Sequence, residues 1–223
     1  MSDWLEFIGA YATFFAMHSV PLRPAVRSRL TTVFGRHGFT LLYSALSIFT
    51  LGWLIVAAGR APYVELWGYN PWQNLVPLTV MAIVCGILAF SLGRPNPFSF
   101  GGAGNENFDP GQPGIIRWMR HPLLVALALW AAAHLVPNSD LAHVILFGSF
   151  AVFALLGMQM IDRRKGRELE MVLKRLDERV RSGPLVPLPE SMSGVVFRVL
   201  FGILIYMTFL GVHPYLFGVS PLQ

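Results

Sequence analysis

Six histidines are the side chains of this sequence best suited to chemistry, and they fall into two groups along the chain. Imidazole ligates transition metals and exchanges protons near neutral pH, so grouped histidines indicate ligation or acid–base chemistry. We predict that three lie near the cytoplasmic face of a membrane: His18, His37 and His121. The other three are predicted near its outer face: His134, His143 and His213. Several imidazoles at one depth of a small bundle favour a site over isolated interfacial side chains.

His121 has the most informative neighbours, because Arg120 precedes it and Pro122 follows it. Proline is favoured at the first position of a helix, which places His121 at the N-cap, in the positive field of the helix dipole. This field, with Arg117 and Arg120, should lower the pKa of the imidazole and keep it neutral at pH 7. Neutral imidazole ligates metal and heme iron, and the same arginines suit a carboxylate or a heme propionate. A role in capping and topology alone fits these residues equally well.

Other catalytic patterns are missing from the sequence. It contains no Gly-x-Ser-x-Gly, Cys-x-x-Cys or His-Glu-x-x-His motif. Cys85 is the single cysteine and lies in a long apolar run, so an internal disulfide is excluded. The glycine-rich stretch 94–116 lacks the Gly-Lys-Ser/Thr of a phosphate-binding loop. We expect this stretch to be a flexible connector or, alternatively, a lid over a cytoplasmic-side site.

The composition places these residues in a membrane protein. Of the 223 residues, 54% are hydrophobic and only 13% are charged, and the mean hydropathy is +0.55. Soluble domains carry about 25% charged residues, so a soluble domain, a disordered chain and a disulfide scaffold are all excluded. The net charge of +5 would suggest a nucleic-acid ligand in a soluble protein. Here we expect no nucleic acid as a partner, because the basic residues follow membrane topology.

Six apolar segments predict the elements that position the histidines. A bilayer needs about 20 apolar residues as a helix. We therefore predict an all-α fold, a single domain over residues 1–223 that crosses the lipid bilayer with six transmembrane helices. The six segments are Trp4–Val20, Phe39–Ala58, Pro71–Gly93, Pro122–Val136, Leu141–Ile161 and Gly194–Phe217. The first of them contains Glu6, and the fourth has only 15 residues.

The distribution of basic residues gives an independent prediction of topology. Fifteen of the 17 lysines and arginines fall in alternate connections, at 21–38, 94–121 and 162–193. Cytoplasmic connections carry the excess of lysine and arginine, so these three should be cytoplasmic. Six spans then place both termini on the opposite, periplasmic side.

The last basic connection has an order of its own at 165–181. Apolar residues recur at helical spacing, which predicts one apolar stripe: Leu169, Val172, Leu173, Leu176 and Val180. Mixed charges occupy the other face. We predict an amphipathic helix that lies on the inner leaflet as a topology anchor or, alternatively, docks a soluble protein partner.

Several short runs, taken in order, resemble the NnrU family. They are His18-Ser19, Leu22-Arg23, Gly93-Arg94-Pro95-Asn96-Pro97-Phe98-Ser99, Arg120-His121-Pro122-Leu123-Leu124 and Leu129-Trp130-Ala131-Ala132-Ala133-His134-Leu135. NnrU-like proteins are bacterial inner-membrane proteins linked to denitrification and nitric-oxide metabolism. The resemblance implies this location, and nitric oxide or a small apolar molecule as substrate.

The chain is also similar to the 15-cis-zeta-carotene isomerases, at His18, His121, His134, Asp162-Arg163-Arg164 and His213-Pro214. Those enzymes bind heme b through the histidine that matches His18 and a histidine on helix 5, where this chain has Phe153-Ala154-Leu155. The similarity implies heme b ligated by His18, with His121 as second metal ligand or propionate partner. Arg23, Arg117, Arg120 and His134 are the further cofactor-binding candidates. The first predicted helix ends and the fourth begins at the same cytoplasmic interface, so we expect His18 and His121 to approach each other there, with Arg23 and Arg120 beside them.

Two further functions remain open at this point. Arg120-His121-Pro122 is similar to the motif of membrane methyltransferases typified by isoprenylcysteine carboxyl methyltransferase, which implies S-adenosylmethionine as a cosubstrate. Glu168 and Glu170 are the nearest match to the acidic residues of that group. The other alternative is a non-catalytic assembly or regulatory protein that docks a partner through 165–181.

Overall fold

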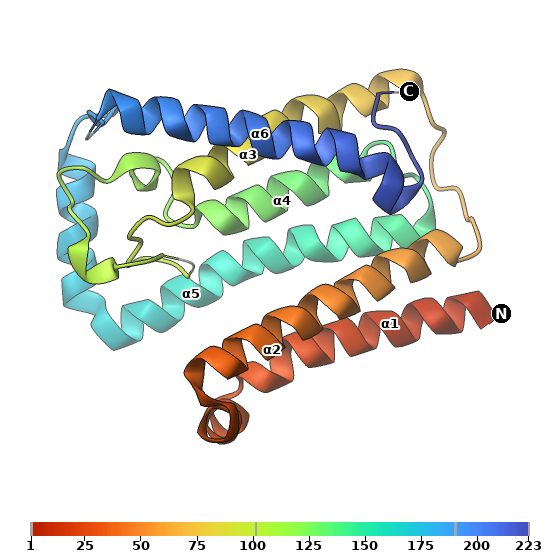
Figure 1. Ribbon diagram of the computed structural model, residues 1–223, viewed down its shortest axis with the longest axis horizontal. Helices are drawn as coiled ribbons and strands as arrows, with labels where there is room; N and C mark the ends of the chain where they lie inside the picture. Colours follow the sequence, from red (N-terminus) through yellow and green to blue (C-terminus); the bar gives the residue numbers. More distant parts are fainter. Residues whose placement is uncertain (1, 101, 190, 223) are drawn as a thin grey trace. The chain divides into compact units, whose positions relative to one another are not determined.

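The computed structural model describes residues 2–100, 102–189 and 191–222, without the side chains of Ser2 and residues 168–170 (Figure 1). Within these ranges the chain is helical and no strand occurs; Glu65 and Asp140 form an isolated bridge. The helices are α1 Ser2–Ser19, α2 Pro24–Arg60, α3 Leu75–Ser91, α4 Pro122–Leu135, α5 Leu141–Ser182 and α6 Met192–Phe217. The predicted all-α fold is confirmed.

Four described stretches are long and apolar enough to cross a membrane: Pro24–Arg60, Pro71–Ser91, Leu141–Arg167 and Met192–Phe217. Each contains most or all of one predicted segment. α4 is apolar but has only 14 residues, and α1 has 18 residues with Asp3 in its first turn. The membrane character of the chain is thus supported, while the number of six spans stays a prediction.

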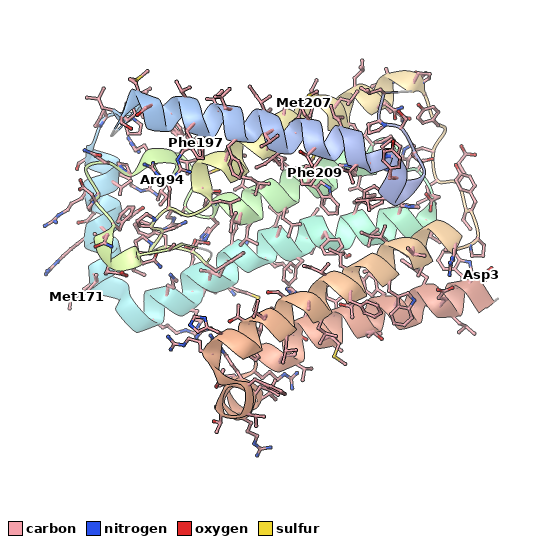
Figure 2. The ribbon with its side chains drawn as sticks, in the orientation of Figure 1. Asp3, Arg94, Met171, Phe197, Met207 and Phe209 are labelled. Carbon is pink, nitrogen blue, oxygen red and sulfur yellow. The ribbon has the colours of Figure 1, made fainter. Side chains whose placement is uncertain are left out.

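α6 shows how these helices meet lipid. Phe197, Met207 and Phe209 project from this helix (Figure 2), with 68%, 59% and 49% of their surface exposed. A helix with such large apolar residues outside is suited to a hydrocarbon environment. Its inner side packs against α3 at Gly202, where an added Cβ would lie 3.4 Å from the Cys85 carbonyl oxygen. Glycine therefore sets the close approach of the two helices.

The first of two compact units comprises Met1–Gly68 and Ser139–Leu146. In it α1 and α2 lie side by side (Figure 1). Phe7 and Phe14 of α1 and Leu54 and Ala57 of α2 are buried in this unit. Where these apolar side chains would otherwise contact water, their burial is the main force that holds α1 and α2 together.

The connection predicted at 21–38 is largely helical, which corrects the sequence interpretation. Pro24 occupies the first turn of α2, where its missing N–H costs nothing. The chain then remains helical up to Gly35, whose φ of +69° and ψ of 168° break the helix direction. Because glycine lacks a Cβ, it adopts this conformation readily. The basic segment before Gly35 is thus a separate helical arm of α2.

The second unit comprises Tyr69–Asn138 and Phe147–Gln223, with α3 in contact with both α4 and α6. α4 also lies beside α5 (Figure 1). The centroid of the Trp130 ring on α4 lies 5.2 Å from that of Phe147 and 5.8 Å from that of Phe150, both on α5. The buried core of the unit extends from the helices into the loop region. Its members are Val84, Ile87, Phe98, Ile115, Ile116, Ala126 and Val180.

The segment 165–181 is helical as predicted, but it is the continuation of α5 rather than a separate helix. Val180 is 3% exposed, and Leu173 and Leu176 pack against the same core. The predicted Leu169 lies outside the described side chains. Part of the apolar stripe therefore covers the protein's own core, since Ile115 and Ile116 supply an apolar surface there. Contact of this segment with the leaflet or with a partner stays a prediction.

Candidate functional site

His121 occupies the N-cap of α4, as the sequence predicts, and its side chain is only 5% exposed. Its Nδ1 lies 3.0 Å from the hydroxyl of Ser99, and its Nε2 lies 3.1 Å from Oδ1 of Asp162. Ser99 is 4% exposed. A buried hydroxyl, a buried imidazole and a partly exposed carboxylate thus form one continuous hydrogen-bonded row.

The chemistry of the three groups fixes the direction of the hydrogen bonds. A carboxylate accepts, so the Nε2–H of His121 donates to Asp162. Nδ1 of the neutral ring then holds a lone pair and accepts the hydroxyl proton of Ser99. This is the order of groups in the catalytic Ser-His-Asp triad, with the two ring nitrogens exchanged.

Burial is the main cause that lowers the pKa of His121 below its ordinary value of 6.5. The charge and hydrogen bond of Asp162 oppose this by raising the pKa, whereas Arg120 and Lys165 lower it. The direction agrees with the expectation from the sequence, but desolvation is the leading cause rather than the helix dipole. The ring is therefore held in the neutral form that accepts a proton.

Arg120 and Lys165 complete the cluster around the row. Arg120 donates from Nη2 to Oδ2 of Asp162 at 3.0 Å. Lys165 donates from Nζ to the carbonyl oxygens of Ser99, at 3.1 Å, and of Pro97. Asp162 and Lys165 are three residues apart on α5 and so share one face. Lys165 thereby binds the loop that holds Ser99, while Asp162 binds Arg120 and His121.

In the described parts of the loop, 94–100 and 102–116, the buried amide of Asn96 joins several segments, a feature that the glycine content alone does not predict. Asn96 Nδ2 donates to the Arg120 carbonyl at 3.0 Å, and its Oδ1 accepts from the Phe98 backbone N–H at 3.0 Å. The Asn96 backbone N–H donates to Oδ1 of Asn105 at 2.7 Å. These hydrogen bonds hold the segment of Ser99 next to His121.

Arg117 lies elsewhere, at the end of α5. It donates from Nε to the Pro184 carbonyl at 3.0 Å and from Nη2 to the carbonyls of Arg181 and Gly183 at 3.4 Å. A guanidinium in this position satisfies carbonyls at the negative end of the helix dipole. Among the described residues Arg117 makes no hydrogen bond to His121, so its predicted role beside the imidazole has no support in the geometry.

His18 and Arg23 belong to the first unit. The Tyr43 hydroxyl donates to the His18 carbonyl at 3.0 Å and lies 3.3 Å from His18 Nδ1. The Ser47 hydroxyl lies 3.5 Å from the same Nδ1, so two hydroxyls of α2 contact one nitrogen of the His18 ring. Arg23 is the exposed N-cap of α2. The approach of His18 to His121 stays a prediction.

His134 lies at the other end of α4 from His121, about 20 Å away at 1.5 Å per helical residue. Its ring packs against Trp130 and Phe147, at centroid distances of 5.4 and 5.3 Å. Its Nδ1 lies 2.8 Å from the Trp130 carbonyl oxygen. This histidine is therefore separate from the cluster around His121.

Sequence reasoning did not select Ser99, Asp162, Lys165 or Asn96 as site residues. One signal in the sequence could have pointed to this site: Asp162 is an acidic residue that directly follows an apolar segment and precedes a run of basic residues. Glu168 and Glu170, the acidic pair proposed for a methyltransferase, lie outside the described side chains. Among the described residues no group of three or more His, Cys, Asp or Glu side chains could hold a metal ion.

The family model described as NnrU protein matches residues 6–221, nearly the whole chain. This chain belongs to the NnrU family. No curated protein and no solved structure matches it. The resemblances of this NnrU protein to carotenoid isomerases and to membrane methyltransferases stay predictions.

Proposed function

We propose that this NnrU protein serves nitrogen-oxide metabolism in the bacterial inner membrane, through an acid–base centre of Ser99, His121 and Asp162. One observation carries the proposal: both ring nitrogens of a buried imidazole are engaged, one by a hydroxyl and one by a carboxylate. A hydroxyl on one ring nitrogen and a carboxylate on the other is the arrangement that lets an imidazole act as a general base and be stabilised when protonated.

The row can move a proton without moving its heavy atoms. Ser99 gives its hydroxyl proton to Nδ1 of His121 as its oxygen takes a proton from a bound substrate, and the reverse transfer delivers a proton to the substrate. The imidazolium is then stabilised by Asp162, whose second oxygen is held by Arg120 at 3.0 Å. Asp162 is 39% exposed, so the row joins the buried hydroxyl to the protein surface. Reduction of nitrogen oxides consumes protons, which gives such a centre a use in the proposed metabolism.

The test is complementation of a denitrifying bacterium that lacks its own copy. We expect His121→Gln and Asp162→Asn to reduce nitric-oxide turnover by about 100-fold, the usual contribution of general acid–base catalysis. The matched controls are Asp177→Asn, which removes another carboxylate of the same helix, paired with Arg181, and His37→Gln, which removes an exposed histidine. Normal turnover with folded His121→Gln protein would refute the acid–base centre.

A second candidate function is heme binding at His18, favoured by the Tyr43 and Ser47 hydroxyls, which contact Nδ1 and so orient the ring. Bound heme b would supply an iron centre for a small ligand such as nitric oxide. His121 does not fit as the second ligand in this arrangement, because an iron bond would break its hydrogen bond to Ser99 or to Asp162. Arg120 is likewise already paired with Asp162.

The absorbance spectrum of protein purified with added heme tests this assignment. We expect a Soret band that His18→Ala abolishes and that His121→Ala leaves in place. Equal heme content in the wild type and in His18→Ala would exclude the assignment. A colourless protein that binds S-adenosylmethionine would instead favour the methyltransferase alternative.

A further inference from the structure

The chain between α5 and α6 contains a proline-rich segment, residues 184–189, with exposed apolar side chains. Leu185, Val186 and Leu188 are 75%, 73% and 82% exposed. The Trp118 ring, which is 60% exposed, lies next to this segment, and its Nε1 donates to the Leu185 carbonyl oxygen at 2.8 Å. Large apolar side chains that are exposed together mark an interaction site.

The segment lies close to the start of a helix that is suited to crossing a membrane. α6 begins at Met192 and is long and apolar enough to span a bilayer. Leu188 precedes Met192 by four residues, so its backbone is at most about 14 Å from the start of α6. Arg175 and Arg179 are exposed on the last turns of α5 and supply positive charge that suits lipid phosphates. A phospholipid leaflet fits both the apolar side chains and this charge.

The backbone of the segment is also suited to the edge of a bilayer. A peptide group that enters lipid must have its N–H and C=O bonded within the protein. Three of the six residues are prolines, which have no N–H to satisfy. The Pro184 carbonyl accepts from Nε of Arg117 at 3.0 Å, and the Leu185 carbonyl accepts from Trp118. These two carbonyls therefore need no bond to water.

Trp118 fits the same position. Indole rings concentrate at membrane–water interfaces, where the ring meets lipid and the N–H still needs a partner. Here the Leu185 carbonyl is that partner, so the exposed ring can meet lipid without an unsatisfied donor. The apolar stripe at 165–181, by contrast, turns Leu173 and Leu176 onto the protein core.

We propose that the proline-rich segment 184–189, together with Trp118, inserts into the adjacent phospholipid leaflet and anchors the end of α5 there. Its three apolar side chains contact the acyl chains, and the exposed arginines of α5 contact the phosphates. Arg117 binds both the Pro184 carbonyl and the Arg181 carbonyl, so the anchor holds the last turn of α5 at the membrane surface. This role is independent of the acid–base centre.

The first experiment attaches an environment-sensitive fluorophore to Leu188→Cys, in a Cys85→Ala background that has no other thiol. The full-length protein is reconstituted in phosphatidylcholine nanodiscs, in which both faces of the bilayer are open to solutes. We expect brominated acyl chains to quench this label and aqueous iodide to leave it bright. The control label on Glu106→Cys, an exposed residue of the loop 94–116, should be quenched by iodide and not by brominated lipid.

The other outcomes of this experiment overturn the proposal. Quenching of the Leu188→Cys label by iodide alone places the segment in water. Protection from both quenchers assigns the surface to a contact between copies of the chain. Labels that respond alike at the two positions show that the segment has no particular contact with lipid.

The second experiment measures how firmly the leaflet holds the segment. Leu188→Asp should speed tryptic cleavage after Arg179 and Arg181 in nanodiscs by about tenfold, since burial of a leucine side chain is worth at least this factor in the population of the released segment. The matched control Met171→Asp changes an exposed apolar residue of α5 outside the segment (Figure 2) and should leave the rate unchanged. A wild-type rate in Leu188→Asp, or an equal acceleration by Met171→Asp, overturns the anchor.

Discussion

Asp162 lies 3.1 Å from the buried imidazole of His121, although 41 residues separate them in the chain. The contact joins α5 to the N-cap of α4. Oδ2 of the same carboxylate accepts from Arg120, so one side chain on α5 binds two consecutive residues before α4. This arrangement fixes which tautomer His121 adopts.

Asp162→Asn should lower the stability of the protein by about 1 kcal/mol. The hydrogen bonds to charged groups are worth about 1.5–3 kcal/mol when buried, but the exposure of Asp162 reduces this. The variant should also lower the pKa of His121 further, because Asp162 raises it. Thermal unfolding and an NMR titration of His121 measure the two effects. Asp177→Asn, which loses only the i,i+4 pair with Arg181, is the control: it should cost about 0.3–0.5 kcal/mol and leave the pKa of His121 unchanged.

Acid should destabilise the protein through His121. Its pKa in the folded state lies below the ordinary 6.5, so the unfolded chain binds this proton more tightly. The free energy of unfolding therefore falls as the pH drops through 6.5, and the fall ends below the folded pKa. We expect His121→Gln to flatten this part of the curve between about pH 7.5 and about pH 5.5. A wild-type slope in this variant, measured by thermal unfolding, would assign the acid sensitivity to other groups.

Asn96→Ala should release the loop that covers Ser99. The substitution leaves the Arg120 carbonyl and the Phe98 N–H without their side-chain partner. An unsatisfied buried polar group costs about 1–3 kcal/mol. We predict faster proteolytic cleavage within 94–116, detected by mass spectrometry of the fragments. The control variant Asn107→Ala changes an exposed residue of the same loop and should be cleaved at the wild-type rate.

Gly35→Ala should destabilise the bend in α2. An added methyl group meets no atom within 4 Å, so the cost comes from φ alone, which at +69° disfavours residues with a Cβ. The expected loss is about 1 kcal/mol, seen as faster hydrogen exchange in residues 24–40. Gly59→Ala, a glycine of the same helix with equally open surroundings and no positive φ, should not increase exchange.

The distribution of lysine and arginine along the chain predicts that both termini are periplasmic. A fluorescent protein that matures only in the cytoplasm should stay dark when fused after Gln223, whereas periplasmic alkaline phosphatase fused there should be active. A fusion within the basic connection 162–193 should give the reverse pattern. Fluorescence from the C-terminal fusion would contradict six spans with the observed charge pattern.

The sequence alone determined the all-α class and the main apolar helices, because composition and long uncharged runs leave few other ways to satisfy the backbone in lipid. It also placed His121 at the start of α4, since Pro122 has one favourable position in a helix. The family followed from short runs in a fixed order. These are local properties, and they require no knowledge of distant contacts.

The tertiary structure decided which groups meet. Ser99, Asn96 and Asp162 lie far from His121 along the chain, and no periodicity predicts that a loop and α5 converge on this ring. Arg117 and Arg120 are close in sequence, yet the first binds the end of α5 and the second binds Asp162. The helix at 165–181 continues α5, and part of its apolar stripe packs against the core of the second unit. Such choices depend on the summed packing of the unit, which local sequence does not specify.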